Sequence, residues 1–205
     1  MWSRLSNMTT SGKLVIISGP SGSGKSTVVQ RLLSQSVLPL VLSVSATTRP
    51  PRAGEENGKN YIFLSNDEFQ KRRLSGEFLE SKEVFGRGYW YGTLRNVVST
   101  GLSEGKWVIL EIDVQGALAV LQDNPQAITI FVHPGSMAEL EKRLRNRGTE
   151  SQESIQRRLD VAAEELALRH HYTHEVINVE INSTVQQLCT LLMQYQGENI
   201  PCSKN

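Results

Sequence analysis

The sequence has little cysteine, no long apolar run and almost no net charge, and each shortage excludes a class of protein. Two cysteines among 205 residues cannot build a disulfide framework, and no His/Cys cluster has zinc spacing. No apolar run approaches the roughly 20 residues that span a bilayer, and the polar stretch 1–13 lacks the apolar segment of a signal peptide. With 22 Lys+Arg against 21 Asp+Glu, the chain has no basic excess for nucleic acid. We therefore expect a cytoplasmic protein with neither membrane nor nucleic-acid partners.

What the chain does have is a regular alternation of apolar, β-branched runs with helical patterns. It is 39% hydrophobic, which suffices for one folded domain that buries roughly 70% of its unfolded surface. The expected strands are 14–18, 40–45, 107–112, 127–132 and 176–178. The expected helices are 26–34, 94–103, 116–121, 136–146, 149–171 and 184–194. Such alternation predicts an α/β fold, a parallel sheet with helices on both faces.

Segment 46–93 interrupts this alternation with prolines, glycines and short strands, so we expect it to be an inserted small lobe. Inside it, Ser65 with Glu68 has the spacing of a capping box that opens a helix, and the same spacing recurs after the lobe at Ser136 with Glu139 and at Thr149 with Gln152. The whole prediction is a domain over 13–196, between N-terminal and C-terminal tails of residues 1–12 and 197–205.

A glycine-rich loop follows the first expected strand and leads into the first helix. It has the pattern G-x-x-x-x-G-K-[ST], in which glycines let backbone N–H groups turn toward a phosphate at a helix N-terminus. Lys25 supplies a point charge for the β- and γ-phosphates, and the Ser26 hydroxyl is suited to Mg²⁺. The predicted ATP-binding residues here are Gly19, Pro20, Ser21, Gly22, Ser23, Gly24, Lys25, Ser26 and Thr27.

The loop alone leaves open a switch GTPase, an ATPase or a small-molecule kinase, so the second substrate must be identified elsewhere. The small lobe carries Arg49 and Arg52 in a proline-stiffened loop, and both are planar forks suited to a phosphate. The base-specifying Asn-Lys-x-Asp of switch GTPases is absent from the sequence.

Several ordered motifs resemble the guanylate kinase family over about residues 13–195. They are the phosphate loop, Ser-x-Thr-Thr-Arg-x-Pro-Arg-x-Gly-Glu over 45–55, Gly-Lys-Asn-Tyr over 58–61, Tyr-Gly-Thr over 91–93, and Leu-Glu-Ile-Asp-Val-Gln-Gly over 110–116. The resemblance implies a P-loop NTPase fold and transfer of the γ-phosphoryl group of ATP to GMP and dGMP, giving ADP and a nucleoside diphosphate.

The resemblance also implies how GMP is bound. It assigns the guanine contacts to Ser45, Glu80 and Thr93. Guanine presents N1–H and N2–H donors side by side, which one carboxylate can accept together. Adenine has neither, and would leave a desolvated carboxylate unpaired.

The family pattern assigns the remaining acceptor contacts to two groups of residues. Those expected at the GMP phosphate are Arg49, Arg52, Tyr61 and Tyr91, with Tyr89 an alternative to Tyr91. Glu111 and Asp113 are expected on the GMP side as well, and Ser26 with Asp113 is expected to hold the Mg²⁺ that accompanies ATP. Asp113 also follows a strand directly, so capping the next helix is a compatible role.

A helical lid over about 143–160 completes the resemblance. It implies that Arg143 and Arg147 lie near the ATP phosphates and that Arg158 returns from the lid. The catalytic set expected from the family is Lys25, Arg49, Arg147 and Arg158. The main alternative is a family-like interaction module without catalysis, which the intact phosphate loop disfavours. Oligomeric state, acceptor sugar and a start at Met8 stay open.

Overall fold

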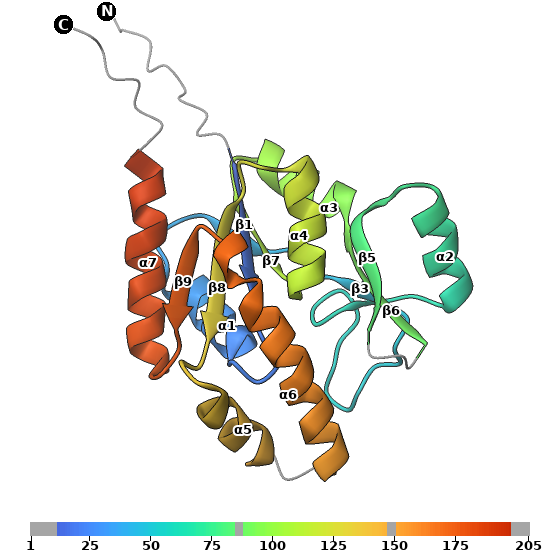
Figure 1. The fold of residues 1–205 in the computed structure, drawn as a ribbon. Helices are drawn as coiled ribbons and strands as arrows, with labels where there is room; N and C mark the ends of the chain where they lie inside the picture. Colours follow the sequence, from blue (N-terminus) through green and yellow to red (C-terminus); the bar gives the residue numbers. More distant parts are fainter. Residues whose placement is uncertain (1–11, 85–87, 147–150, 198–205) are drawn as a thin grey trace, which may run out of the picture.

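The computed structural model describes residues 12–84, 88–146 and 151–197, and its centre is a five-stranded sheet. Every neighbouring pair in this sheet is parallel, and the strand order is β2-β7-β1-β8-β9. The strands are β1 (Lys13–Ser18), β2 (Leu40–Leu42), β7 (Trp107–Glu111), β8 (Ile128–His133) and β9 (His174–Ile177). The predicted α/β fold with a parallel sheet is therefore confirmed (Figure 1).

Helices cover both faces of this sheet, as the apolar runs of its strands require. The helices outside the small lobe are α1 (Lys25–Gln35), α3 (Arg95–Ser103), α4 (Val114–Asp123), α5 (Met137–Arg145), α6 (Gln152–Ala167), a 3₁₀ turn (Arg169–His171) and α7 (Ile181–Gly197). Alternate residues of β1 point to opposite faces: Val15 packs in one core with α1 and α7, and Ile16 packs in the other with α3 and α4. Because both cores are built on β1, the loop that follows this strand starts from a rigid position.

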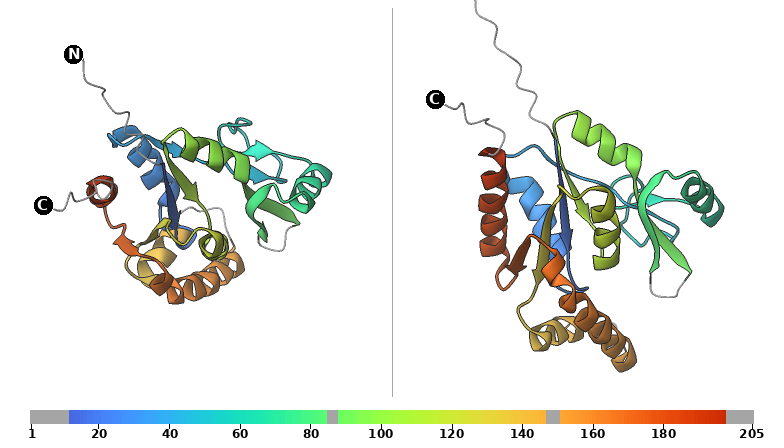
Figure 2. Two further views of the ribbon diagram at one scale, coloured as in Figure 1. Left: turned by 90° about the horizontal axis from the view of Figure 1, so that it is seen from above. Right: turned by 45° about the horizontal axis from the view of Figure 1, so that its top comes forward.

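The small lobe, residues 46–93, forms a second sheet beside the first. Its elements are β3 (Ala46–Thr47), β4 (Ile62–Phe63), α2 (Asn66–Leu74), β5 (Phe78–Val84) and β6 (Tyr89–Leu94). The strand order is β4-β3-β6-β5, and the lobe has its own apolar core around Phe69 and Phe78, whose rings stack with centroids 4.5 Å apart. Figure 2 shows the lobe on the side of the large sheet away from α7.

Helices α5 and α6 form a hairpin near the carboxyl ends of the large sheet's strands (Figure 1). Leu140 and Leu144 of α5 pack on Ile155 and Leu159 of α6, so the hairpin has an apolar seam of its own. The two helices overlap the segment expected as a lid, about residues 143–160, and extend beyond it at both ends.

The helix boundaries follow local capping chemistry. The Ser65 and Ser136 hydroxyls accept from the backbone N–H groups of Glu68 and Glu139, so both predicted N-caps are confirmed. The N-cap of α6 is Ser151, whereas Thr149, the expected cap, lies outside the described residues.

Several predicted boundaries were wrong. The last helix begins at Ile181 rather than 184, because the Glu180 carboxylate accepts the Asn182 and Ser183 N–H groups at 2.9 and 2.6 Å. Strand β2 ends at Leu42, where the chain leaves the large sheet for the lobe. Within the described part of the chain, no helix combines the length and apolar character needed to cross a membrane.

Candidate active site

The carboxyl ends of the parallel strands meet at one edge of the large sheet, and the phosphate loop lies at that edge. It joins β1 to α1 with Gly19, Gly22 and Gly24 at φ values of 136°, 96° and 88°. A Cβ at Gly19 would lie 2.1 Å from the Val132 carbonyl oxygen, and one at Gly24 would lie 2.6 Å from the Asn178 Nδ2. Glycine is therefore required at both positions, for the backbone conformation and for space.

Helix α1 begins directly after this loop and has no acidic residue in its first turn. Lys25 Nζ donates to the carbonyl oxygens of Gly19 and Pro20 at 2.5 and 2.9 Å, so the ammonium group is held over the loop. A cavity of about 180 Å³ opens here, lined by Ser21, Gly22, Gly24, Lys25, Ser26 and Thr27. A helix N-terminus, backbone N–H groups and a lysine converging on one cavity form an anion site.

Asn178, at the end of β9, fixes the loop from behind. Its Nδ2 donates to the Ser23 carbonyl at 2.8 Å, and its Oδ1 accepts from the Thr184 hydroxyl at 3.1 Å. Arg143 of α5 donates to the Asn178 carbonyl at 2.9 Å and to Glu139 at 2.8 Å. Arg143, expected near the ATP phosphates, thus lies behind the loop and stabilises its backbone.

Two oxygen groups meet where β7 ends. The Ser26 hydroxyl donates to Glu111 Oε1 at 2.5 Å, which joins the start of α1 to the end of β7. A hydroxyl after the phosphate-loop lysine and a carboxylate on a neighbouring strand are the donors that hold Mg²⁺ in P-loop proteins, and both are hard oxygen ligands. The residues present therefore fit Mg²⁺, although the described residues contain no cluster of three or more metal-ligating side chains.

Asp113, at the same edge of the sheet, caps a helix and pairs with a lysine. Its Oδ1 accepts the Gly116 N–H at 2.7 Å as the N-cap of α4, and its Oδ2 lies 3.2 Å from Lys82 Nζ of β5. The anticipated capping role is confirmed. Glu111, expected on the GMP side, contacts Ser26, and Asp113, expected at the metal, contacts a lysine.

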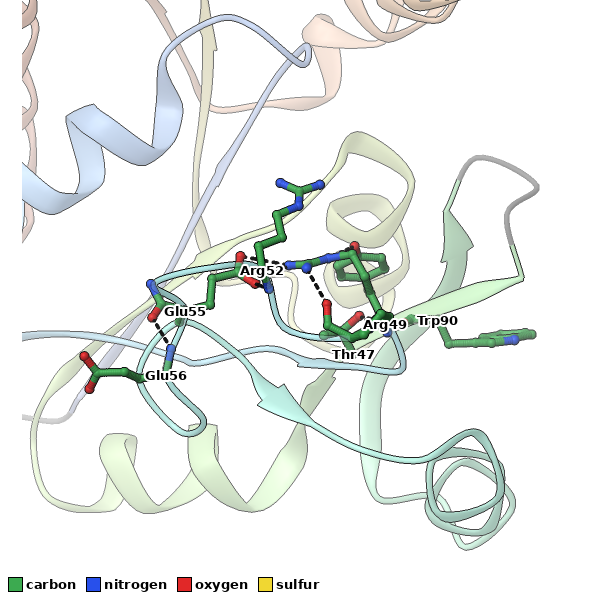
Figure 3. A network of polar contacts seen from close by, with 9 residues as sticks. Thr47, Arg49, Arg52, Glu55, Glu56 and Trp90 are labelled. Carbon is green, nitrogen blue, oxygen red and sulfur yellow. Dashed lines mark hydrogen bonds and ion pairs between the residues drawn. The ribbon is translucent and has the colours of Figure 1, made fainter. Parts of the chain in front are cut away.

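Arg49 lies on a loop of the small lobe whose next residues are exposed, but its own side chain is buried. Arg49 donates to both Glu55 oxygens at 2.9 and 3.0 Å (Figure 3). It also donates to the Tyr91 hydroxyl at 3.1 Å. Its guanidinium lies 5.4 Å from the Tyr61 ring centroid. The Glu55 bond raises the pKa of Arg49, and the same pair lowers the pKa of Glu55. Arg52 is exposed, and its backbone N–H also donates to Glu55.

Glu80 and Thr93 face each other across β5 and β6 and are paired in the strand register. The Thr93 hydroxyl donates to Glu80 Oε1 at 2.7 Å, and a Cβ on Gly116 would lie 3.1 Å from Glu80 Oε2. Burial against the start of α4 raises the pKa of Glu80 to about 7, while the Thr93 bond acts in the opposite direction. Ser45, also expected at the base, is half-buried just before β3.

Two further residues belong to this region, and the sequence reading named neither. Lys82 reaches Asp113 from β5. Glu165 of α6, with Ser21 and Arg158, lines a small cavity of about 20 Å³. Burial raises the pKa of Glu165 to about 7. The charge of Asp113 acts in the same direction, and the charges of Lys25 and Lys82 lower this pKa. Arg158, expected to return from the lid, lines this cavity together with Ser21 of the phosphate loop, whereas Arg147 falls outside the described residues.

The parallel sheet, the glycine loop leading into α1 and the facing hydroxyl–carboxylate pair define a P-loop nucleotide-binding protein. A second, mixed sheet with buried Arg and Glu side chains opposite the loop is the arrangement of a kinase with a separate acceptor site.

The comparisons with known proteins identify the family. The model of the family described as guanylate kinase matches residues 11–195, and the chain belongs to this family. It is 57% identical to the guanylate kinase of Rhodopirellula baltica, over 95% of this chain and 93% of that one. It is 43% identical to that of Rubrobacter xylanophilus, over 93% and 98%. The crystal structure of guanylate kinase from Anaplasma phagocytophilum is similar at 32% identity and a TM-score of 0.73, over 91% and 87%.

Proposed function

We propose that the chain transfers the γ-phosphoryl group of ATP to GMP, with ADP and GDP as products. The observation that carries the proposal is the pair Glu80–Thr93, a desolvated carboxylate with a hydroxyl on one face of the lobe sheet. The chain combines this pair with a complete phosphate loop. A purely adhesive module would need neither the loop nor a buried carboxylate.

Glu80 would read the base. When it is ionised, its two oxygens accept the guanine N1–H and N2–H together, and the Thr93 hydroxyl orients one of these oxygens. Adenine offers no donor at either position, so a buried carboxylate would lose its water without gaining a partner. This difference supports GMP over AMP. It does not distinguish GMP from dGMP, which differ in the sugar alone.

Arg49 and Arg52 would bind the acceptor phosphate, with the hydroxyls of Tyr61 and Tyr91 as further donors. Arg49 is already fixed by Glu55 and Tyr91 in the unliganded chain. Most of its N–H groups donate to Glu55, Tyr91 and the Pro50 carbonyl, so a phosphate would replace part of these contacts at a guanidinium that is already oriented.

The chemistry requires alignment rather than a general base. An anionic oxygen of the GMP phosphate attacks the γ-phosphorus, and the bond from phosphorus to the β,γ-bridging oxygen breaks. ADP departs with that electron pair, so no proton has to move. Lys25 would stabilise charge on the transferring group, while the lobe arginines hold the attacking oxygen in line.

Mg²⁺ belongs to the proposal as the partner of ATP, held through Ser26 and Glu111, with Asp113 close by. When bound, it would neutralise charge on the ATP phosphate oxygens.

The helical hairpin would supply the remaining positive charge. Arg158 lies beside Ser21 of the loop, and Arg147 is included on the family pattern alone. Approach of the hairpin and the small lobe would exclude water, which otherwise competes with GMP for the phosphoryl group. A cytoplasmic location, where ATP and GMP are available, completes the proposal.

A labelling experiment tests this function. The chain is incubated with Mg²⁺, ATP carrying a labelled γ-phosphate, and one acceptor among GMP, dGMP, AMP and UMP, or none. We expect label in GDP and dGDP. Little label should appear in ADP made from AMP, or in free phosphate. Label in free phosphate with every acceptor would replace the proposal with an ATPase, and ATP binding without turnover would favour the interaction module.

A further inference from the structure

Lys82 lies at the boundary between the small lobe and the large sheet. Its Nζ is 3.2 Å from Asp113 Oδ2, and the two side chains are 44% and 35% exposed. β5, which carries Lys82, packs against α4, whose N-cap is Asp113. The ion pair therefore bridges the lobe to the edge of the sheet where the phosphate loop lies.

The strand register puts Lys82 on the acceptor face of the lobe. Lys82 is two residues after Glu80, so both side chains leave the same face of β5. Across the pair of strands, Glu80 is opposite Thr93 and Lys82 is opposite Tyr91. The Cβ atoms of directly opposed residues lie about 5 Å apart, so Lys82 is next to Tyr91. The Tyr91 hydroxyl in turn accepts a hydrogen bond from Arg49. Lys82 is thus the next cation beside the expected phosphate site.

Lys82 also faces the donor side. The Glu165 carboxylate lines a cavity with Ser21 of the phosphate loop and interacts electrostatically with both Lys82 and Lys25, so both lysines lie within electrostatic range of that region. An in-line transfer brings two anionic phosphates into that region, and each additional cation lowers their repulsion.

The contact with Asp113 does not by itself explain a lysine at this position. Asp113 already caps α4 through its other oxygen, and a half-exposed ion pair adds little stability. Lysine is a point charge on a flexible stem, so it can move between two anions at low cost.

We propose that Lys82 is a further substrate-contacting residue, which leaves Asp113 when a nucleoside monophosphate enters and binds the acceptor phosphate. This inference rests on the proposed function, because it takes the acceptor to be GMP. It adds a third cation to Arg49 and Arg52 at that phosphate.

Guanosine separates this role from a structural one, because it has the base of GMP and no phosphate. In equilibrium titrations, Lys82→Met should raise the Kd for GMP about ten- to hundredfold, the loss expected for one charged contact, and leave the Kd for guanosine unchanged. In steady-state assays the KM for GMP should rise, while the KM for ATP stays the same. Lys82→Arg keeps the charge and should recover most of the loss.

Lys106→Met is the matched control. Lys106 is also 44% exposed and also paired with a carboxylate, Glu104 at 2.6 Å, but it lies at the start of β7, the far end of the sheet. This variant should bind GMP and guanosine as the wild type does.

Three results would overturn the inference, and they are distinguishable. If wild type makes no GDP, the proposed function fails and the inference falls with it. If wild type makes GDP and Lys82→Met binds GMP normally, only the role of Lys82 is refuted. An equal loss of affinity for guanosine and GMP would make Lys82 a structural residue, and thermal unfolding of both Met variants shows whether the fold persists.

Discussion

The phosphate loop and the small lobe both offer positive charge to a phosphate, but they are built differently. The loop uses backbone N–H groups and a helix end, held by glycines and by Asn178 behind it. The lobe uses side chains, and its cations already contact carboxylates of the chain: Arg49 contacts Glu55, and Lys82 contacts Asp113. The proposed donor site is therefore built on backbone, whereas the proposed acceptor site is built on side chains that contact one another.

This difference suggests a division of tasks. Every nucleoside triphosphate has the same phosphates, so a backbone cradle suffices for the donor. The acceptor must be selected by its base, and selection requires side chains whose partners change when the correct ligand arrives. Substitutions in the loop should therefore affect catalysis, and those in the lobe should affect acceptor choice.

The largest expected effect is on the donor side. Lys25→Ala should fold normally but lose phosphoryl transfer by about two to three orders of magnitude, the cost of removing a key electrostatic donor. Coupled assays of ADP release with ATP and GMP measure this loss, and thermal unfolding checks the fold. Turnover near the wild-type rate would remove the loop lysine from the mechanism.

The next effect is on acceptor choice. Glu80→Gln replaces one of the two oxygens that accept from guanine with an N–H donor, so the KM for GMP should rise and the preference for GMP over AMP should fall at least about tenfold. The ratio of kcat/KM for the two acceptors gives the answer. An unchanged ratio would show that another group reads the base.

A pH titration sharpens the same assignment. With a pKa of about 7, Glu80 gains a proton as the pH falls below 7, and the protonated carboxyl cannot accept two guanine N–H groups. Guanosine affinity should therefore weaken by up to about tenfold per pH unit below 7 and level off above it. Guanosine is preferred to GMP here because it has no titrating phosphate. A flat profile between pH 5.5 and 8 would contradict the assignment.

The smallest expected effect concerns stability. The folded pKa of Glu165, about 7, exceeds its ordinary value of 4.5, so the unfolded chain ionises first as the pH rises. This group then lowers the free energy of unfolding between about pH 4.5 and 7. Glu165→Gln should make that decline shallower, by about 1 kcal/mol between pH 5 and 7 after allowance for partial exposure.

Urea unfolding at pH 5, 6 and 7 measures this change in slope. Glu153→Gln, a substitution at a carboxylate on the first turn of α6 whose side chain is 85% exposed, is the control and should leave the slope unchanged. Equal slopes for wild type and Glu165→Gln would mean that this carboxyl is not buried in solution.

Much of this arrangement could be predicted because its signals are local. Ser65 and Ser136 cap helices that begin right after them, and the glycine spacing of the phosphate loop is contained in eight residues. Contacts between distant segments have no such local signal. Ser26 and Glu111 are 85 residues apart, and the family pattern had assigned Glu111 to the acceptor side.

Lys82 and Glu165 were missed for the same reason. Each lies in a segment whose charged residues resemble an ordinary solvent-facing surface, and no spacing in the sequence shows that both face the phosphate loop. The packing of β5 against α4 and of α6 against α5 brings them there, and this packing is a property of the whole fold.

One pair of titrations tests the division between the two sites most directly. Arg49→Met is titrated with GMP and, separately, with a non-hydrolysable ATP analogue in the presence of Mg²⁺. We predict that the Kd for GMP rises at least about tenfold, the cost of a lost charged contact, while the Kd for the analogue stays unchanged. An unchanged affinity for GMP, or an equal loss of affinity for both ligands, would contradict the account.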